Sequence, residues 1–440
     1  MKRFILEKLK SWQSSANRKP LILRGARQVG KTYVLKEFGQ NCFPNYHYIN
    51  FEKNKLIHKA FKENFEPNKI LDLISLEINQ KIAEDDLIIF DEIQELPEAL
   101  TSLKYFAEDL PKQAICAAGS LLGLKFNDLS FPVGKVDYLD MFPMNFYEFL
   151  NGVQRMDLLE YIDKPLEEID SIPELVHEKL WQELKNYFVT GGLPEVVERY
   201  RVNNNSSLEK FNEVRLVQKQ ILSSYLDDMA KHSGKENSMN LERLFRNIPE
   251  QLAKNIDAST EKFRFKSIIP GVSAYSRLSG LIDWLEAVGL IIKVKIVHRA
   301  EIPFSAFTKE NRFKLFVFDI GLLGALSELN PKYILDFNFS NYKGFFAENF
   351  VAQEFRVKLG INNGLYTWTE GQAEIEFLMD LDAKVVPIEV KSGLNLKAKS
   401  LESFKNRYSP DKSILLSAQN FEYNHDKRLL KVPLYLAGSI

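Results

Sequence analysis

The sequence predicts an α/β protein that begins with a parallel sheet covered by helices. Three observations predict this fold class. Short apolar runs alternate with longer helical patterns over residues 1–150. A glycine-rich motif follows the first of these runs. The chain, at 440 residues, is also too long for one ordinary core, so we expect more than one domain.

Four apolar runs are the expected strands of this first sheet. They lie at residues 20–24, 46–51, 86–90 and 114–118. Their near-continuous apolar character is typical of parallel strands that are buried on both faces. Residues 1–10 mix apolar and basic side chains, which predicts an amphipathic surface helix ahead of the first strand.

The charge balance and the cysteine count limit the environment of the protein. Lys and Arg number 58 and Asp and Glu number 59, so a nucleic acid or an anionic membrane surface would have to be met by a local patch. Two cysteines cannot form a disulfide framework, which favours a reducing compartment and a cytoplasmic location. No stretch of about 18 consecutive apolar residues occurs, so we expect a soluble protein with no membrane partner.

Residues 25–32 match the pattern G-x-x-x-x-G-K-[ST], and they stand between a predicted strand and a predicted helix at 33–38. In such a loop the backbone N–H groups wrap a phosphate, Lys31 reaches the β- and γ-oxygens, and Thr32 ligates Mg²⁺. The motif therefore predicts a site for ATP with Mg²⁺. The expected nucleotide-binding residues are Gly25, Ala26, Arg27, Gln28, Val29, Gly30, Lys31, Thr32 and Tyr33. The side chain of Arg27 either contacts a phosphate or faces solvent, and the sequence leaves this open.

Polar residues follow two later strands of the predicted sheet. Asp91 ends the third strand, where a carboxylate would join Thr32 in the Mg²⁺ site. Glu92 follows and is the candidate general base that activates water for attack on the γ-phosphate. Ser120 follows the fourth strand, and it is either a catalytic sensor of the γ-phosphate or a turn serine that caps the residues from 121 onward. No arginine finger can be assigned.

The remainder of the chain predicts three further regions. Residues 151–235 are mostly helical, with a loop forced by glycines and a proline at 190–194, and they form the expected helical lid. Residues 236–330 combine helices with strands at 289–297 and 314–318, which predicts a winged-helix-like domain. Its basic cluster of Lys293, Lys295, His298 and Arg299 either meets DNA phosphates or forms a solvated strand face. Residues 340–440 show the order αβββαβ.

Acidic residues and a lysine recur in the strands of this last region. The strand period of two places Glu389 and Lys391 on one face, and Glu376 lies on the preceding strand. Glu348, on the preceding helix, could join them. The set resembles the PD-(D/E)XK nuclease core, and this resemblance implies a second metal site at Glu348, Glu376 and Glu389 with Lys391 beside it. The nuclease pattern prefers Asp where this chain has Glu376, so a solvated polar face on a hairpin is the alternative.

The loop, the acidic strand end and the polar strand end together resemble the AAA-type ATPases. More narrowly, the chain is similar to a bacterial and archaeal group of ATP-binding proteins that carry a C-terminal domain of unknown function. The combination of residues 141–148 and 191–195 narrows the resemblance to this group. The resemblance implies an AAA-type P-loop domain at 1–150, and a PD-(D/E)XK nuclease-like domain at 340–440.

Three functions follow as hypotheses from these patterns. The leading one is a Mg²⁺-dependent ATPase that acts as a nucleotide-driven switch or motor for its C-terminal domains, with Lys31, Glu92 and Ser120 as catalytic residues. The second is a nucleotide-gated nuclease. The third is a nonenzymatic switch that binds DNA or protein. Formation of a homo-oligomer is left open by the sequence.

Overall fold

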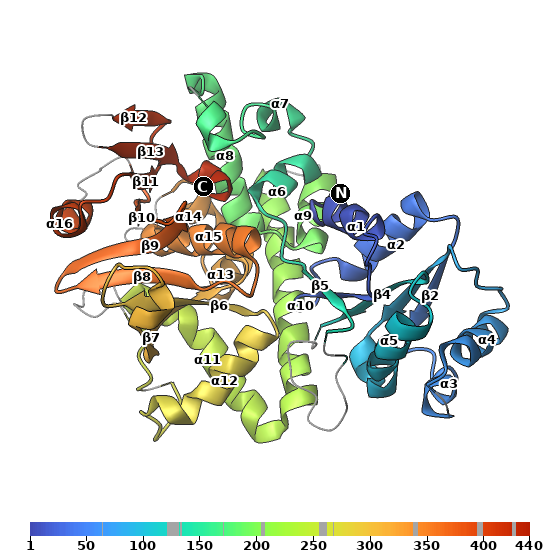
Figure 1. The fold of residues 1–440 in the computed structure, drawn as a ribbon. Helices are drawn as coiled ribbons and strands as arrows, with labels where there is room; N and C mark the ends of the chain where they lie inside the picture. Colours follow the sequence, from blue (N-terminus) through green and yellow to red (C-terminus); the bar gives the residue numbers. More distant parts are fainter. Residues whose placement is uncertain are drawn as a thin grey trace. The chain divides into compact units, whose positions relative to one another are not determined.

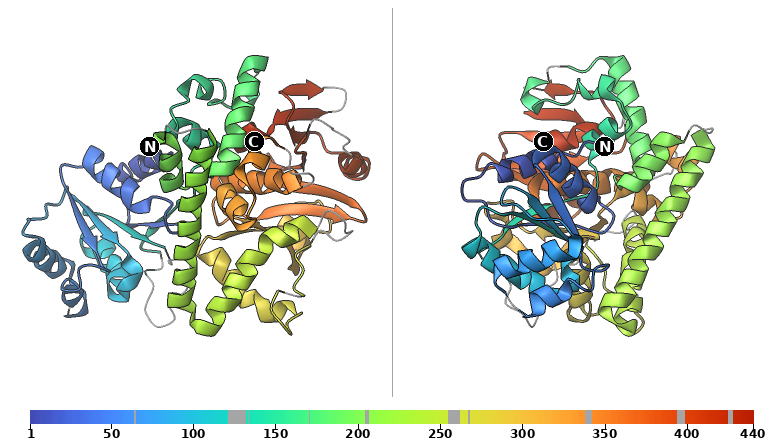
Figure 2. Two further views of the ribbon diagram at one scale, coloured as in Figure 1. Left: turned by 180° about the vertical axis from the view of Figure 1, so that it is seen from behind. Right: turned by 90° about the vertical axis from the view of Figure 1, so that its right-hand side faces the viewer.

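The computed structural model describes residues 1–63, 65–120, 132, 134–169, 171–203, 207–254, 262–266, 268–337, 342–393, 399–424 and 428–440 (Figures 1 and 2). The chain divides into two compact units. The N-terminal unit contains residues 2–142 and 287–289, and the C-terminal unit contains residue 1, residues 143–286 and residues 290–440. Across the described ranges, no helix has the length and apolar character needed to cross a membrane.

The N-terminal unit is built on a five-stranded sheet in which all pairings are parallel, as predicted. Its strands are β1 (Leu21–Arg24), β2 (Tyr46–Asn50), β3 (Leu87–Asp91), β4 (Ala114–Gly119) and β5 (Asp137–Asp140), in the order β2-β3-β4-β1-β5. The four predicted strands are confirmed. β5 was not predicted, because only four residues form it and Asp stands at both of its ends.

Helices cover both faces of this sheet (Figure 1). They are α1 (Ile5–Gln13), α2 (Lys31–Cys42), α3 (His58–Glu63), α4 (Pro67–Ile78), the 3₁₀ helix η1 (Ile93–Glu95) and α5 (Pro97–Asp109). Alternate strand residues such as Ile22, Ile88 and Phe90 form one core with α3, α4 and α5. This alternation follows from the strand period of two, and α2 packs on the strands from the other side.

The C-terminal unit begins with helices. They are α6 (Phe146–Gly152), α7 (Met156–Leu159), η2 (Leu166–Glu168), α8 (Glu174–Thr190), α9 (Pro194–Val202), α10 (Ser207–Ser233), α11 (Lys235–Lys254) and α12 (Tyr275–Ala287). The predicted loop at 190–194 separates α8 from α9. Glycine is required there, because a Cβ atom on Gly192 would lie 2.0 Å from the carbonyl oxygen of Met144.

The rest of this unit is organised around one eight-stranded sheet. Its strands are β6 (Ile291–Val297), β7 (Thr308–Val317), β8 (Leu365–Glu370), β9 (Ala373–Leu381), β10 (Lys384–Val390), β11 (Ser413–Ser417), β12 (Glu422–Asn424) and β13 (Leu429–Pro433), in the order β12-β13-β11-β10-β9-β8-β6-β7. The connecting helices are η3 (Phe304–Phe307), α13 (Ile320–Leu326), α14 (Pro331–Leu335), α15 (Tyr342–Leu359), α16 (Lys399–Tyr408) and η4 (Leu434–Ser439). The predicted order αβββαβ is therefore present as α15-β8-β9-β10-α16-β11.

One strand pairing in this region was not predicted. The predicted hairpin at 289–318 exists as β6 and β7, but β6 also pairs in parallel with β8. The hairpin thus extends the sheet of the C-terminal strands, and the sheet crosses the expected boundary between a winged-helix-like domain and the last domain. Hydrogen bonds between backbones specify no side chain, so the local sequence could not reveal this pairing.

A tight turn fixes the hairpin between β9 and β10. Asp382 and Ala383 are its two central residues, with φ of 55° and 59°. Positive φ at both positions matches the twist of the flanking strands and is typical of a two-residue hairpin. The register that follows pairs Ile388 with Phe377, so Glu389 stands beside Glu376 across the two strands.

A buried carboxyl in this unit predicts a measurable pH effect. Glu354, in α15, is 1% exposed, and its Oε1 accepts a hydrogen bond of 3.0 Å from the Phe146 backbone N–H. Burial raises the pKa of Glu354 from its ordinary value of 4.5 to about 8. Between these values the folded chain keeps a proton that the unfolded chain releases. The contribution of Glu354 to stability is therefore greatest below pH 4.5 and is lost as the pH rises through 8.

We expect a Glu354→Gln variant to lose part of this pH dependence. In the wild type the free energy of unfolding should fall by up to roughly 1.4 kcal/mol per pH unit over this window because of Glu354. Gln keeps an acceptor for Phe146 but carries no charge. Thermal unfolding midpoints of the full chain at pH 6 and pH 8.5 should therefore differ less in the variant. The exposed Glu301→Gln is the matched control, and an unchanged difference in Glu354→Gln would contradict the expectation.

Candidate functional site

The glycine-rich loop lies between β1 and α2, and its conformation explains its glycines. Gly25 has φ of 151°, and a Cβ atom there would stand 2.1 Å from the carbonyl oxygen of Met141. Gly30 has φ of 97° in the left-handed region and caps the start of α2. Gln28 also has a positive φ, of 62°. The loop therefore turns sharply at several residues and directs the N-terminus of α2 toward its centre, which suits an anion.

Lys31 is held inside this loop. Its ammonium nitrogen donates to the carbonyl oxygens of Gly25 and Ala26, each at 2.8 Å, and the residue is 9% exposed. Burial lowers the pKa of Lys31 to about 8, although the carboxylates of Glu92 and Asp91 oppose this shift. Both hydrogen-bond acceptors of this buried cation are neutral carbonyl oxygens, which compensate its charge poorly. A polyphosphate chain would supply the missing negative charge.

The structure brings together the two residues predicted to hold Mg²⁺. Thr32 Oγ1 donates to Asp91 Oδ2 at 2.8 Å. Thr32 lies in the first turn of α2 and Asp91 ends β3, so the contact spans the position of β4 in the strand order. A hydroxyl and a carboxylate are hard oxygen ligands, the set that Mg²⁺ prefers. The residues present therefore fit the ion.

Tyr48 also contacts this carboxylate, and the sequence analysis did not identify it. Its hydroxyl donates to Asp91 Oδ2 at 2.7 Å and accepts a bond of 3.2 Å from the Asn50 amide. Burial raises the pKa of Tyr48 to about 12, so the phenol stays protonated and remains a donor. Tyr48 lies on β2, the neighbour of β3, and only the strand order could have indicated its position.

Two other predicted residues meet beside the loop. Arg27 Nε donates to Ser120 Oγ at 3.3 Å, which connects the loop with the end of β4. Residues 121–131, which Ser120 would cap in the alternative interpretation, lie outside the described residues. Tyr33, by contrast, is 58% exposed on α2. Glu92 directly follows Asp91, and its Oε2 accepts a bond of 2.5 Å from the Gln94 amide.

The side chain of Arg3 is buried against the glycine-rich loop, although the sequence predicted Arg3 on a surface helix. It is 5% exposed and precedes α1, which begins at Ile5. Its Nη1 donates to the carbonyl oxygen of Val29 at 2.8 Å, and its Nη2 donates to the carbonyl oxygen of Phe142 at 2.7 Å. The planar guanidinium thus ties the loop to the segment after β5.

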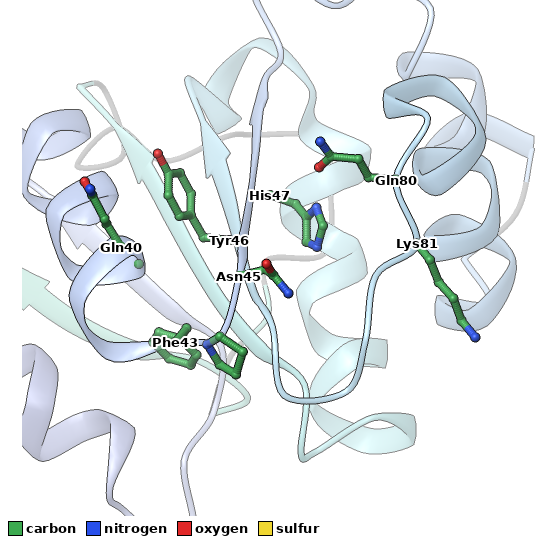
Figure 3. A pocket seen from close by; sticks show the side chains of 9 residues that line it. Gln40, Phe43, Asn45, Tyr46, His47, Gln80 and Lys81 are labelled. Carbon is green, nitrogen blue, oxygen red and sulfur yellow. The ribbon is translucent and has the colours of Figure 1, made fainter.

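A polar pocket of about 520 Å³ lies elsewhere in the N-terminal unit (Figure 3). Gln40, Asn45, His47 and Gln80 are among the residues that line it. His47 Nε2 lies 3.0 Å from Asp86 Oδ2; His47 is the second residue of β2, and Asp86 directly precedes β3. The glycine-rich loop follows the opposite, carboxyl ends of parallel strands. The pocket is therefore separate from the predicted nucleotide site.

The C-terminal acidic residues are brought together, but with lysines among them. Lys391 Nζ lies 2.7 Å from Glu389 Oε1 and 3.9 Å from Glu376 Oε1. Glu348 Oε2 lies 3.2 Å from Lys314 Nζ, and Lys314 also contacts Glu374. Lys314 belongs to β7 and was not part of the predicted acidic site. Burial raises the pKa of Glu348 and of Glu376, against the effect of these lysines.

The arrangement of these carboxylates can be compared with the second metal site that the sequence predicts. Within the described ranges, no group of three or more His, Cys, Asp or Glu residues is arranged to hold a metal ion. The carboxylates are instead compensated by Lys314 and Lys391.

The predicted basic cluster is only partly free of carboxylates. Lys293 lies 2.6 Å from Glu286 and 3.3 Å from Asp283, whereas Lys295, His298 and Arg299 are exposed.

Comparison with family models places three domains on the chain. Residues 17–150 match an AAA domain, residues 182–333 match a domain of unknown function (DUF8612), and residues 343–436 match another domain of unknown function (DUF4143). No curated protein matches the chain. The N-terminal unit therefore contains an AAA-type P-loop domain, the ATP-binding domain of such ATPases.

Several solved structures resemble the chain distantly. A Walker-type ATPase of Pyrococcus abyssi is 17% identical, with a TM-score of 0.43, and the match covers 73% of this chain and 94% of the other. The Holliday junction branch migration motor RuvB of Thermotoga maritima is 14% identical, with a TM-score of 0.30 and coverage of 65% and 87%. The ORC1 protein of Aeropyrum pernix in complex with DNA is 12% identical, with a TM-score of 0.29 and coverage of 74% and 90%. Similarity at these scores carries no functional argument.

Proposed function

We propose that the protein binds MgATP at residues 25–33 and hydrolyses it, and that the cycle acts as a switch or motor for the C-terminal regions. The observation that carries the proposal is the 2.8 Å contact between Thr32 and Asp91 next to a loop that holds Lys31. A cation, a hydroxyl and a carboxylate that converge in this way support binding of a triphosphate and its metal ion.

Each residue of the site has a role that its chemistry supports. Backbone N–H groups of the loop and the N-terminus of α2 would bind the phosphates, and Lys31 would contact the β- and γ-oxygens. Thr32 and Asp91 would hold Mg²⁺, which supplies charge neutralisation and polarisation of the γ-phosphoryl group. Glu92 would accept the proton of the attacking water. Ser120, bonded to Arg27, would sense the γ-phosphate from the end of β4.

The test of this function is phosphate release from ATP by the full chain, with and without Mg²⁺. We expect release that requires Mg²⁺. Measuring it with and without DNA also shows whether a nucleic acid stimulates the reaction. Absence of Mg²⁺-dependent release from ATP under both conditions would refute the enzyme assignment.

Tyr48 provides a prediction about the metal site. A Tyr48→Phe variant removes the donor to Asp91 and leaves the ring in place. We expect the Mg²⁺ concentration for half-maximal phosphate release to rise roughly tenfold, as for other residues that orient a metal ligand. The rate at saturating Mg²⁺ should change little. Tyr46→Phe, two residues earlier on β2, is the matched control, and equal Mg²⁺ requirements in both variants would contradict the role.

A nuclease is the second candidate, and one observation favours it. Glu376 and Glu389 are neighbours on β9 and β10, and among the described residues Glu389 Oε2 has no hydrogen-bond partner. Such carboxylates beside Lys391 could support metal-dependent cleavage. Cleavage of DNA that is lost in Glu389→Ala would establish this activity. No cleavage of several DNA and RNA substrates with Mg²⁺ or Mn²⁺ would remove it.

A nonenzymatic switch is the third candidate, in which ATP only stabilises one conformation. The exposed Lys295, His298 and Arg299 would then contact DNA phosphates, or a protein partner would bind instead. Salt-dependent retention on DNA without phosphate release would support this function. For any of the three, we propose a cytoplasmic location, because Cys42 and Cys116 are free thiols.

A further inference from the structure

We propose that Gln94 is a positioning residue for Glu92, and that its side-chain amide fixes the Glu92 carboxylate in the orientation needed to accept a proton from water. This inference rests on the ATPase function proposed above. It adds a residue that neither the loop motif nor the acidic strand end includes.

The backbone after β3 creates the contact between the two side chains. Glu92 has φ of 53° and ψ of 44°, a left-handed conformation that is strained for a non-glycine residue. The Glu95 N–H donates to the Glu92 carbonyl oxygen at 3.0 Å and closes a turn. This turn folds the Gln94 side chain back toward Glu92. Its Nε2 then donates to Glu92 Oε2 at 2.5 Å.

Gln94 is a rigid donor because of its surroundings. It is 8% exposed, and its neighbours Ile93 and Leu96 are fully buried in the apolar core of the N-terminal unit. Glu92 is only half-buried. A flexible carboxylate therefore meets an amide whose position is fixed by packing. The hydrogen bond to an ionised group restricts the carboxylate to one orientation.

The test compares variants that differ in the donor. Gln94→Met keeps the length of the side chain but cannot donate, and Gln94→Glu keeps its shape but places a carboxylate against Glu92. We expect each to lower kcat for ATP about tenfold or more while KM stays within about twofold, the pattern of a group that acts on the chemical step. Thermal unfolding shows whether each variant is folded.

Gln113→Met is the matched control. Gln113 is 7% exposed and donates to the Asp86 carbonyl oxygen at 2.8 Å, next to the other end of β3. This variant loses an equally buried amide, so any stability effect should be similar, but kcat should not change. Equal losses of kcat in the control and in Gln94→Met would show that burial alone matters and would overturn the proposal.

A double variant separates positioning from a role independent of Glu92. In a Glu92→Gln background, Gln94→Met should change kcat by less than about twofold, because the group it positions is already absent. Losses that multiply would overturn the proposal, as would a kcat in Gln94→Met equal to or above the wild type. If the wild type releases no phosphate, or Glu92→Gln releases it at the wild-type rate, the ATPase function fails and the inference falls with it. If the wild type and Glu92→Gln behave as expected and the Gln94 variants keep the wild-type kcat, only the inference about Gln94 fails.

Discussion

A Glu92→Gln variant is expected to bind MgATP as tightly as the wild type and to release phosphate about 10²- to 10⁴-fold more slowly, the range of general base catalysis. The amide has the size of the carboxylate and can still bond to Gln94, but it cannot accept a proton from water. Because Asp91, Thr32 and Lys31 are unchanged, the contacts proposed to bind the nucleotide remain. The loss should therefore lie almost entirely in kcat.

Two measurements check this expectation in the same preparation. Nucleotide affinity is measured by calorimetry or by a fluorescent ATP analogue, and turnover is measured by phosphate release at saturating MgATP. Glu95→Gln, on the 3₁₀ helix η1 that directly follows Glu92, is the control and should retain the wild-type rate. Wild-type turnover in Glu92→Gln would show that Glu92 is not the general base.

A Lys31→Ala variant is expected to lose most of its affinity for ATP. Charge-assisted hydrogen bonds to phosphate contribute about 1.5–3 kcal/mol each, so we expect roughly 100-fold weaker binding or more. Misfolding should not explain the loss, because Lys31 is a buried cation whose pKa burial lowers to about 8. Removing such a group also removes the free-energy cost of burying its charge, so the variant should still fold.

The affinity of this variant for MgATP is compared with that of Lys59→Ala, which removes an exposed lysine of the same unit. Thermal unfolding of both variants in the absence of nucleotide shows whether they are folded. Added MgATP should raise the unfolding midpoint of Lys59→Ala and of the wild type but not of Lys31→Ala. Equal affinities in Lys31→Ala and the wild type would refute the assignment of the loop.

The secondary structure of the last hundred residues was largely predictable, and the sheet pairing was not. The hairpin of β9 and β10 follows from alternating apolar residues that flank a two-residue turn. β12 and β13 were missed because they are short, with three and five residues. The membership of β6 and β7 in the same sheet depends on a parallel pairing with β8, more than sixty residues away. Local patterns of apolar residues do not indicate which distant strands pair with each other.

The sequence by itself determined the glycine-rich loop, Lys31, Thr32 and the carboxylates at the end of β3, because each of these positions requires one residue type at a fixed spacing. Only the tertiary structure decided which other side chains contact these residues. Tyr48, Gln94 and Arg3 reach the site because the strand order places β2 beside β3, because Glu92 turns left-handed, and because the N-terminus packs under the loop. Side-chain contacts of this kind depend on how distant segments pack. Many residue types satisfy the same local pattern, so the pattern does not reveal them.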